Sequence, residues 1–150
     1  MKNIIAFLCL SLFLSGSLFS QQKRESREKI KALKIAFLTE QLNLSPKEAQ
    51  QFWPIYNTYD NKQNSLRYKS RQEMKKAIEA KGSIENISEQ EAQKMIELKL
   101  ETDKKIYELQ SEFVSKVKKV LSHKKIIQLQ IAEMEFGRNL MKKYRRKKEK

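Results

Sequence analysis

The chain has 150 residues, of which 33% are charged, three are glycine and two are proline. This length indicates one domain, and the composition favours long helices over short strands joined by tight turns. The formal net charge of +14 points to an acidic partner, such as nucleic acid, an anionic membrane surface or acidic protein segments. A single cysteine excludes a disulfide framework.

Residues 1–20, MKNIIAFLCLSLFLSGSLFS, have the layout of a secretory signal peptide. Lys2 precedes an uncharged run over 4–19, and small residues close that run. The run is shorter than the roughly 20 apolar residues that a membrane-spanning helix needs, although an uncleaved N-terminal anchor stays as the alternative.

Cleavage is expected after Ser20, so that the mature chain begins at Gln21, with Ser17 as the second choice. Cys9 lies near the start of the apolar run, too early for a lipid-attachment cysteine, and is removed with it. The mature chain, residues 21–150, then has no cysteine and a net charge of +13, since one lysine is lost. Export would place the chain in the periplasm and exclude DNA and RNA as usual partners.

The segment ESREKIKALKIAFLTEQLN, residues 25–43, predicts the first helix of the mature chain. Ile30, Leu33, Phe37 and Gln41 follow at steps of three and four residues. Apart from Gln41, these positions form an apolar stripe on one helix face.

The stretch LSPKEAQQFWPIY, residues 44–56, holds both prolines of the chain. Ser45 is a good N-cap, Pro46 occupies the first helical position, and Glu48 can reach back to the cap. The three residues form a capping box in which the missing N–H of proline costs nothing. Pro46 is therefore predicted to start a helix.

Pro54 removes one helical hydrogen bond and clashes with the carbonyl of Gln50. Apolar residues nevertheless keep helical spacing across it, at Phe52, Tyr56, Tyr59 and Leu66. We expect one long helix over about 46–80 that bends near Trp53. A clean break into two helices is the alternative, because the residue before proline resists the helical conformation.

A linker at 81–83 ends this helix, with Gly82 suited to a helix C-terminus. Ser88 and Glu91 repeat the capping-box spacing and predict a third helix that runs to about Val120. Its apolar positions are Met95, Ile106, Leu109, Phe113, Val117 and Val120.

Ser122 offers one more N-cap and predicts a fourth helix after it. The apolar positions of this helix are Ile126, Leu129, Phe136, Leu140 and Tyr144. The basic C-terminal tail KKYRRKKEK has little to bury and is expected to fray.

The two helix junctions look alike. LSPKEAQQF at 44–52 and LSHKKIIQL at 121–129 each place Leu-Ser between two helices, with an apolar residue seven positions after the serine. The predicted fold class is therefore all-α, with four helices in two helix-turn-helix units. A helix over 46–80 would be roughly 50 Å long. So small a protein cannot cover it throughout, and we expect an elongated molecule that dimerises to shield its apolar faces.

The mature chain shows no catalytic constellation. It has one histidine, no cysteine and no glycine-rich phosphate loop, and its glutamates are spaced as helix-surface ion-pair partners. His123 follows the cap Ser122 and is interpreted as an exposed surface residue. The sequence therefore predicts no enzymatic activity, no metal site and no cofactor.

Two groups of residues on the long helix have alternative interpretations. Phe52, Tyr56 and Tyr59 share one helix face with typical core spacing. We expect them to pack on the first helix through Leu33 and Phe37 rather than to form a ligand cage.

Arg67, Arg71 and Lys75 form a basic stripe of like charges at i, i+4 spacing, which costs helix stability. Tyr68 and Met74 lie beside the stripe, and a surface that mixes cations with adaptable apolar groups suits loose binding of many partners. These five residues are the candidate client-binding site. The alternative is a solvated basic face.

These residues and motifs resemble those of the Spy/CpxP-like periplasmic proteins, which carry a Leu-Thr-x-x-Gln motif twice. Positions 44–48 read LSPKE and positions 121–125 read LSHKK, so serine replaces threonine and neither final glutamine is present. The helix-junction motif residues are Leu44, Ser45, Pro46, Glu48, Leu121 and Ser122. The stretch AFLTEQLNLSPKEAQQFWPIYNTYD also looks like the opening of small exported sensors linked to extracytoplasmic sigma factors, a branch of the same superfamily.

The resemblance implies a cradle-shaped, antiparallel helical dimer that binds unfolded or stress-damaged proteins without ATP. Some relatives instead report envelope stress to a signalling partner. One branch responds to metals through histidine-rich segments, which this chain lacks.

Three functions follow from these observations. The leading hypothesis is a periplasmic, ATP-independent holdase that binds unfolded or acidic protein segments. The second is a stress sensor or inhibitor subunit that docks on a membrane-bound regulator. The third is a basic protein that coats an anionic membrane or cell-wall polymer through its C-terminal tail.

Overall fold

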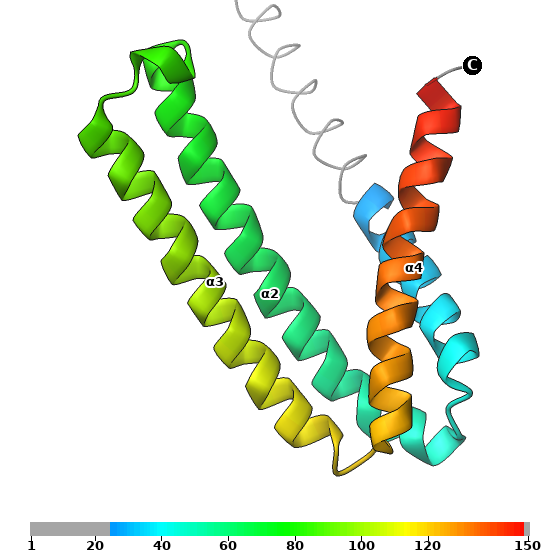
Figure 1. Ribbon diagram of the computed structural model, residues 1–150. Helices are drawn as coiled ribbons and strands as arrows, with labels where there is room; N and C mark the ends of the chain where they lie inside the picture. Colours follow the sequence, from blue (N-terminus) through cyan, green and yellow to red (C-terminus); the bar gives the residue numbers. More distant parts are fainter. Residues whose placement is uncertain (1–24, 149–150) are drawn as a thin grey trace, which may run out of the picture. The chain divides into compact units, whose positions relative to one another are not determined.

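The structure, a computed structural model, describes residues 25–148, except for the side chains of 147–148. The expected signal peptide lies outside the described residues. The described chain forms a helix over 25–42, then α2 (Pro46–Lys81), α3 (Glu89–Val117) and α4 (His123–Lys148), with one 3-10 turn, η1 (Ile84–Asn86) (Figure 1). No strand is present within 25–148. The predicted all-α class is confirmed.

The contacts divide the described chain into two units. One unit is Leu44–Ile127 and contains the hairpin of α2 and α3, which run side by side in opposite directions (Figure 1). The other unit combines the residues up to Asn43 with those from Gln128 onward.

The start of α2 confirms the predicted capping box. The Glu48 backbone N–H donates to Ser45 Oγ at 3.3 Å, and the Ser45 N–H donates to Glu48 Oε2 at 2.8 Å. Pro46 follows the cap at the first helical position, so its missing N–H breaks no helical hydrogen bond.

The helix α2 passes through Pro54 without a break, as a single element of 36 residues. The favoured interpretation of one long helix is confirmed, and the bend near Trp53 stays a prediction. An interior proline costs a helix about 3 kcal/mol, which has to be offset by packing. Phe52 and Tyr56 lie on either side of Pro54 in sequence and are both fully buried, so they supply that packing.

Gly82 caps α2 with a φ of 80°, a left-handed conformation that glycine adopts without strain. After η1, Ser88 and Glu91 form the second predicted capping box, with Glu91 N–H donating to Ser88 Oγ at 3.3 Å. Lys81 Nζ lies 3.0 Å from Glu91 Oε1 and ties the end of α2 to the start of α3.

The helix α3 ends three residues earlier than expected. The N–H of Val120 donates to the Val117 carbonyl at 2.9 Å, and the N–H of Leu121 donates to the same oxygen at 2.8 Å. The first bond spans three residues instead of the four of an α-helix, so the last turn tightens, as is common at helix ends. The chain therefore turns after Val117, and α4 starts after Ser122, whose Oγ accepts from the Lys125 N–H at 3.3 Å.

The core of the hairpin is aromatic. The ring of Tyr59 stacks on Phe113 with centroids 4.4 Å apart, and Tyr56 meets the same ring edge-on at 6.1 Å. Phe52 stacks on Tyr56 at 5.3 Å. The interpretation of these residues as core is confirmed, and the residue of α3 on which they pack is Phe113.

The expected stripe on the first helix is wrong at Leu33 and in the partner of Phe37, whereas Ile30 and Phe37 are half-buried. Leu38 and Leu42 are fully buried, whereas Leu33 is 45% exposed and Gln41 is exposed. Phe37, named as a partner for the aromatic residues of α2, packs on Phe136 of α4 at 5.8 Å. The sequence permitted two overlapping apolar faces on this helix, and packing selected the face with two leucines four residues apart.

The helix α4 buries Leu129 and Ala132 on the side that carries Phe136. Lys34 Nζ lies 3.5 Å from Glu133 Oε1 and adds an ion pair within this unit. Helical structure continues to Lys148, so the expected fraying is not seen within the described part of the tail. Tyr144, counted among the apolar positions, is 49% exposed.

Candidate functional site

The two helix junctions meet through a charge pair. Lys125 Nζ donates to both carboxylate oxygens of Glu48, at 2.9 and 2.7 Å, although the residues are 77 positions apart. Both side chains are about three-quarters buried. Glu48 and Lys125 occupy the fifth position of the two similar junction motifs, so the structure brings equivalent positions of the repeat together.

This environment holds Glu48 in its charged form. The hydrogen bond from Lys125 is the largest cause, followed by those from Ser45, and together they lower the pKa of Glu48 from 4.5 to about 2. The pKa of Glu91 at the second capping box falls to about 2 for the same reasons, with Lys81 first and Ser88 second. Both carboxylates are therefore fully ionised at neutral pH and act as structural anchors.

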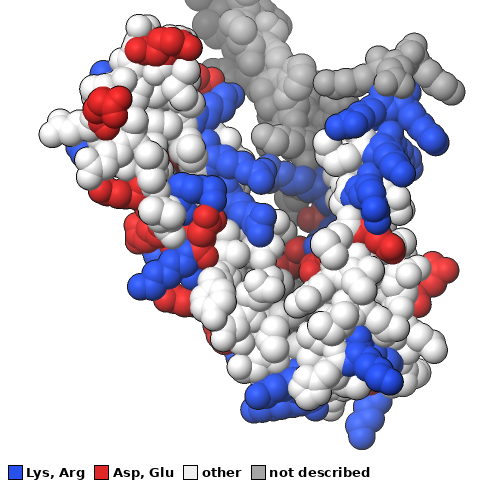
Figure 2. Space-filling model, in the orientation of Figure 1, with Lys and Arg blue, Asp and Glu red and all other residues white. Residues whose placement is uncertain are grey.

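The basic stripe lies on the distal half of α2. Arg67 and Arg71 are exposed and make no ion pair with any other described residue, whereas Lys75 lies 3.3 Å from Glu79. Tyr68 is 51% exposed and Met74 is half-buried. Figure 2 shows lysine and arginine side chains gathered over this part of α2.

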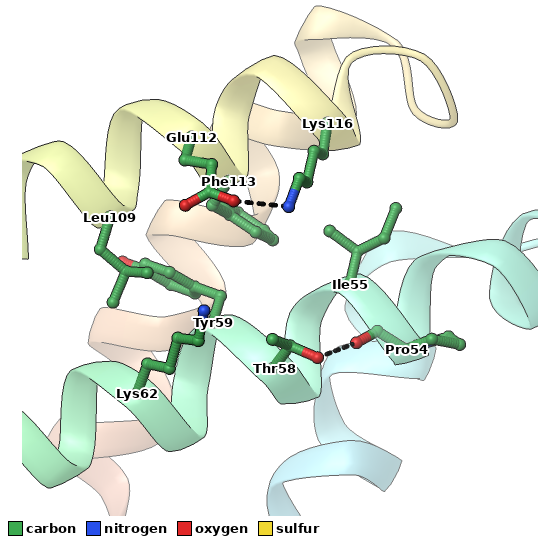
Figure 3. Close-up of a pocket in the computed structure, with 9 residues that line it drawn as sticks. All are labelled: Pro54, Ile55, Thr58, Tyr59, Lys62, Leu109, Glu112, Phe113 and Lys116. Atoms are coloured by element: carbon green, nitrogen blue, oxygen red, sulfur yellow. Dashed lines mark hydrogen bonds and ion pairs between the residues drawn. The ribbon is translucent and has the colours of Figure 1, made fainter.

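A groove between α2 and α3 was not found from the sequence. Its deeper part has a volume of about 250 Å³ and an apolar floor that includes Tyr59, Leu109 and Phe113 (Figure 3). Lys62 and Glu112 stand on its rim, and Glu112 pairs with Lys116 at 2.5 Å. A shallower part of about 430 Å³ continues along the hairpin and shares Lys62, Leu109 and Glu112.

The groove runs on a different side of α2 from the basic stripe. Lys62 is five residues from Arg67, which turns the two side chains about 140° apart around a helix with 3.6 residues per turn. The hairpin therefore presents a cationic side and an apolar side. Sequence spacing could have revealed the groove only if the partner face of α3 had been known.

A family model described as LTXXQ motif family protein matches residues 30–118, more than half of the chain. The chain belongs to the LTXXQ motif family. This family is the Spy/CpxP-like periplasmic superfamily, so the resemblance drawn from the sequence is confirmed. No curated protein and no solved structure matches the chain.

The junction pair lies within the two segments that resemble the family motif. The matched region includes the first motif at 44–48 and ends before the second at 121–125. In this LTXXQ family protein, the positions of the two motif glutamines hold Glu48 and Lys125. At these two positions the chain thus has opposite charges that bind each other.

The helix α3 of this LTXXQ family protein carries an exposed apolar stripe that was not predicted from the sequence. Ile96, Leu100 and Tyr107 are 61%, 63% and 72% exposed. Their spacing of four and seven residues places them on one helix face. The spacing is visible in the sequence, but core positions such as Ile106 and Phe113 lie only about 100–120° from Tyr107 around the helix, so spacing alone does not separate the two faces.

None of the described helices combines the length and the apolar character required to cross a membrane. Within 25–148, no three His, Cys, Asp or Glu side chains are grouped so that they could hold a metal ion. His123 is exposed at the start of α4.

Proposed function

We propose that this LTXXQ family protein is an exported, ATP-independent holdase that binds unfolded or stress-damaged envelope proteins. The observation that carries the proposal is the two-sided hairpin of α2 and α3. One side presents Arg67 and Arg71, which have no ion-pair partner among the described residues, beside exposed Tyr68, and the other presents an apolar groove.

The two sides have different physical roles in client capture. Exposed cations raise the encounter rate with acidic unfolded segments, because long-range attraction steers the approach. Apolar surface then slows dissociation, because it removes client side chains from water. Met74 and Tyr68 adapt to varied sequences beside the cations, which suits a client set without a common motif.

A homodimer is part of this proposal. The exposed stripe of Ile96, Leu100 and Tyr107 gives α3 an apolar face suited to a second copy of the chain. Lys99 pairs with Asp103 beside the stripe. A self-complementary contact along α3 would leave the groove and the basic stripe open to clients.

Export to the periplasm is also part of this proposal. Residues 1–20 have the pattern of a signal peptide, and the family is periplasmic. The mature protein should begin at Gln21. The intact mass of the protein purified from the periplasm tests this N-terminus. A retained Met1 would contradict the proposed localisation.

The decisive experiment compares two variants that lose the same charge. Arg67→Gln, Arg71→Gln and Lys75→Gln together remove the basic stripe, and Lys118→Gln, Lys119→Gln and Lys124→Gln together remove exposed lysines elsewhere. One assay measures suppression of aggregation of a denatured acidic client at near-stoichiometric protein, and stopped-flow binding of a fluorescent acidic client at low and moderate salt measures the rates.

We expect the stripe variant to bind the client more slowly and with weaker salt dependence, and the control variant to resemble the parent protein. The on-rate should change more than the off-rate, since exposed charges act mainly on encounter. Thermal stability of the stripe variant should be equal or slightly higher, because like charges at i, i+4 repel. If the parent protein suppresses no aggregation and a pull-down yields one membrane-bound regulator, the protein is a sensor subunit instead.

A further inference from the structure

The outer face of α4 carries an exposed stripe that neither the core nor the proposed holdase surface uses. Ile131, Met134 and Met141 are 46%, 67% and 58% exposed. They lie three and seven residues apart, which keeps them within one helix face. Arg138 and Arg145 continue the same line, at i+7 and i+14 from Ile131.

The charge along this part of α4 has one sign. From Phe136 to Lys148 the sequence contains seven lysines and arginines and no aspartate or glutamate. Lys142, Arg145 and Arg146 are exposed and make no ion pair with another described residue. Figure 2 shows this cluster of basic side chains at the C-terminal part of α4.

Two glutamates lie in the same region of α4. One faces away from the stripe, and the other makes only a long ion pair. Glu133 points to the inner side of its unit, where it pairs with Lys34 at 3.5 Å. Glu135 lies on the flank and approaches Arg138 at 3.9 Å, the longest ion pair of the described chain. The outer face therefore keeps its positive charge.

We propose that the outer face of α4 docks on an anionic phospholipid bilayer, with Ile131, Met134 and Met141 in the interface and Arg138, Lys142 and Arg145 on lipid phosphates. A helix that lies in the interface plane needs an apolar stripe and nearby lysines or arginines. From Ile131 to Arg145 the stripe is about 21 Å long, enough to rest on several lipid headgroups.

Charge complementarity favours a bilayer over a second copy of α4, and the apolar side chains favour it over a cell-wall polymer. A second copy of α4 offers no acidic row to match the cations, since its described acids are the two glutamates already engaged. A polyanionic cell-wall polymer would satisfy the cations but leave the isoleucine and the methionines in water. A bilayer of anionic lipids provides phosphate groups and acyl chains in the same layer.

The test measures binding of the protein, purified from the periplasm, to vesicles by flotation. The vesicles contain phosphatidylglycerol and phosphatidylcholine in equal parts, or phosphatidylcholine alone. One variant combines Arg138→Gln, Lys142→Gln and Arg145→Gln, and another combines Ile131→Gln, Met134→Gln and Met141→Gln. The matched control combines Lys118→Gln, Lys119→Gln and Lys124→Gln, which removes the same charge from another part of the molecule.

We expect the parent protein to bind only the anionic vesicles. The cation variant should bind on the order of 10²-fold more weakly, because each Lys or Arg near an anionic surface contributes about fivefold. The apolar variant should bind about tenfold more weakly or worse. The control should change binding by a few-fold at most, and unchanged circular dichroism should show that all variants fold.

Three results would overturn the proposal. Equal losses for the cation variant and its control would mean that net charge alone attracts the protein. No flotation of the parent protein would exclude a lipid surface. A shift of the apolar variant from dimer to monomer in sedimentation would identify the stripe as a self-association face. The holdase assay contains no vesicles, so a failed holdase proposal leaves this result unaffected.

Discussion

The two ends of the α2–α3 hairpin are stabilised by different interactions. The aromatic end, next to the helix junctions, is formed by Phe52, Tyr56, Tyr59, Phe113 and Val117, all of them buried. The turn end is formed by half-buried and small residues, namely Ser70, Met74, Ala77, Met95, Leu98 and Thr102.

The turn end lacks aromatic packing and is stabilised by local interactions instead. Ser88 and Glu91 close a capping box, Gly82 caps α2, and Lys81 joins Glu91 across the turn. Ser70 and Thr102 are the two buried polar residues in the described chain, and the Thr102 hydroxyl donates to the Leu98 carbonyl at 2.7 Å. Aromatic packing thus secures one end, while caps and ion pairs hold the end that presents the basic stripe.

The comparison predicts its largest effect at Phe113. Phe113→Ala removes the ring on which Tyr56 and Tyr59 pack and should destabilise the protein by about 3–5 kcal/mol. Met95→Ala at the turn end should cost about 1–2 kcal/mol, because Met95 is only half-buried. Urea unfolding followed by circular dichroism measures both. Equal losses would contradict the contrast between the two ends.

Pro54 also lies at the aromatic end, but its replacement should raise the stability of the protein rather than lower it. Pro54→Ala should raise stability by about 2 kcal/mol, from the ~3 kcal/mol cost of an interior proline less up to ~1 kcal/mol for the freer unfolded chain. Differential scanning calorimetry gives the change. A loss of stability would show that the proline ring contributes more to the packed groove than it costs α2.

The two N-caps should matter equally. Ser45→Ala and Ser88→Ala each remove the hydroxyl that accepts an N–H of the first helical turn, and each should cost about 1 kcal/mol. Chemical denaturation of the two single variants is the measurement. A much larger loss for Ser45→Ala would mean that its removal also frees Glu48 from Lys125.

The smallest effect depends on pH. The folded-state pKa of Glu48 lies near 2, below its ordinary value of 4.5, so its stabilising contribution is complete above about pH 4.5 and is lost as the pH falls toward 2. Glu48→Gln should therefore be less stable than the parent protein at pH 7, and the difference should shrink by pH 3.

Charge exchange provides the control for this last experiment. Glu48→Lys with Lys125→Glu reverses the pair and should regain part of the stability that either single change loses. Absence of any coupling in this cycle would show that the two junctions meet without depending on the charge pair.

The sequence predicted what depends on near neighbours along the chain. Both capping boxes, the start of α2 at Pro46 and the glycine cap form as expected, and glutamates such as Glu101 and Glu112 make the helix-surface ion pairs that the spacing of the glutamates predicted. Each of these rests on atoms within four residues of one another, so local geometry is enough to specify it. The continuity of α2 through Pro54 also followed from the spacing of apolar residues.

The sequence did not predict correctly which apolar faces are buried or on which residues they pack. The first helix was expected to use Leu33, yet it buries Leu38 and Leu42. Phe113 is the α3 partner of the aromatic residues of α2, and the groove that results could not be seen before that pairing. Each of these helices carries more apolar positions than one face needs, and spacing alone does not rank the faces.

By itself, then, the sequence determined the all-α class, the helix boundaries at their caps, the excess of positive charge and the family. Only the tertiary structure decided which faces are buried and which stay open, and it alone joined Glu48 to Lys125 across 77 positions. The reason is physical: capping and helical spacing act over a single turn. The choice of a buried face minimises exposed apolar area over the whole molecule, and it therefore depends on residues that are distant in the chain.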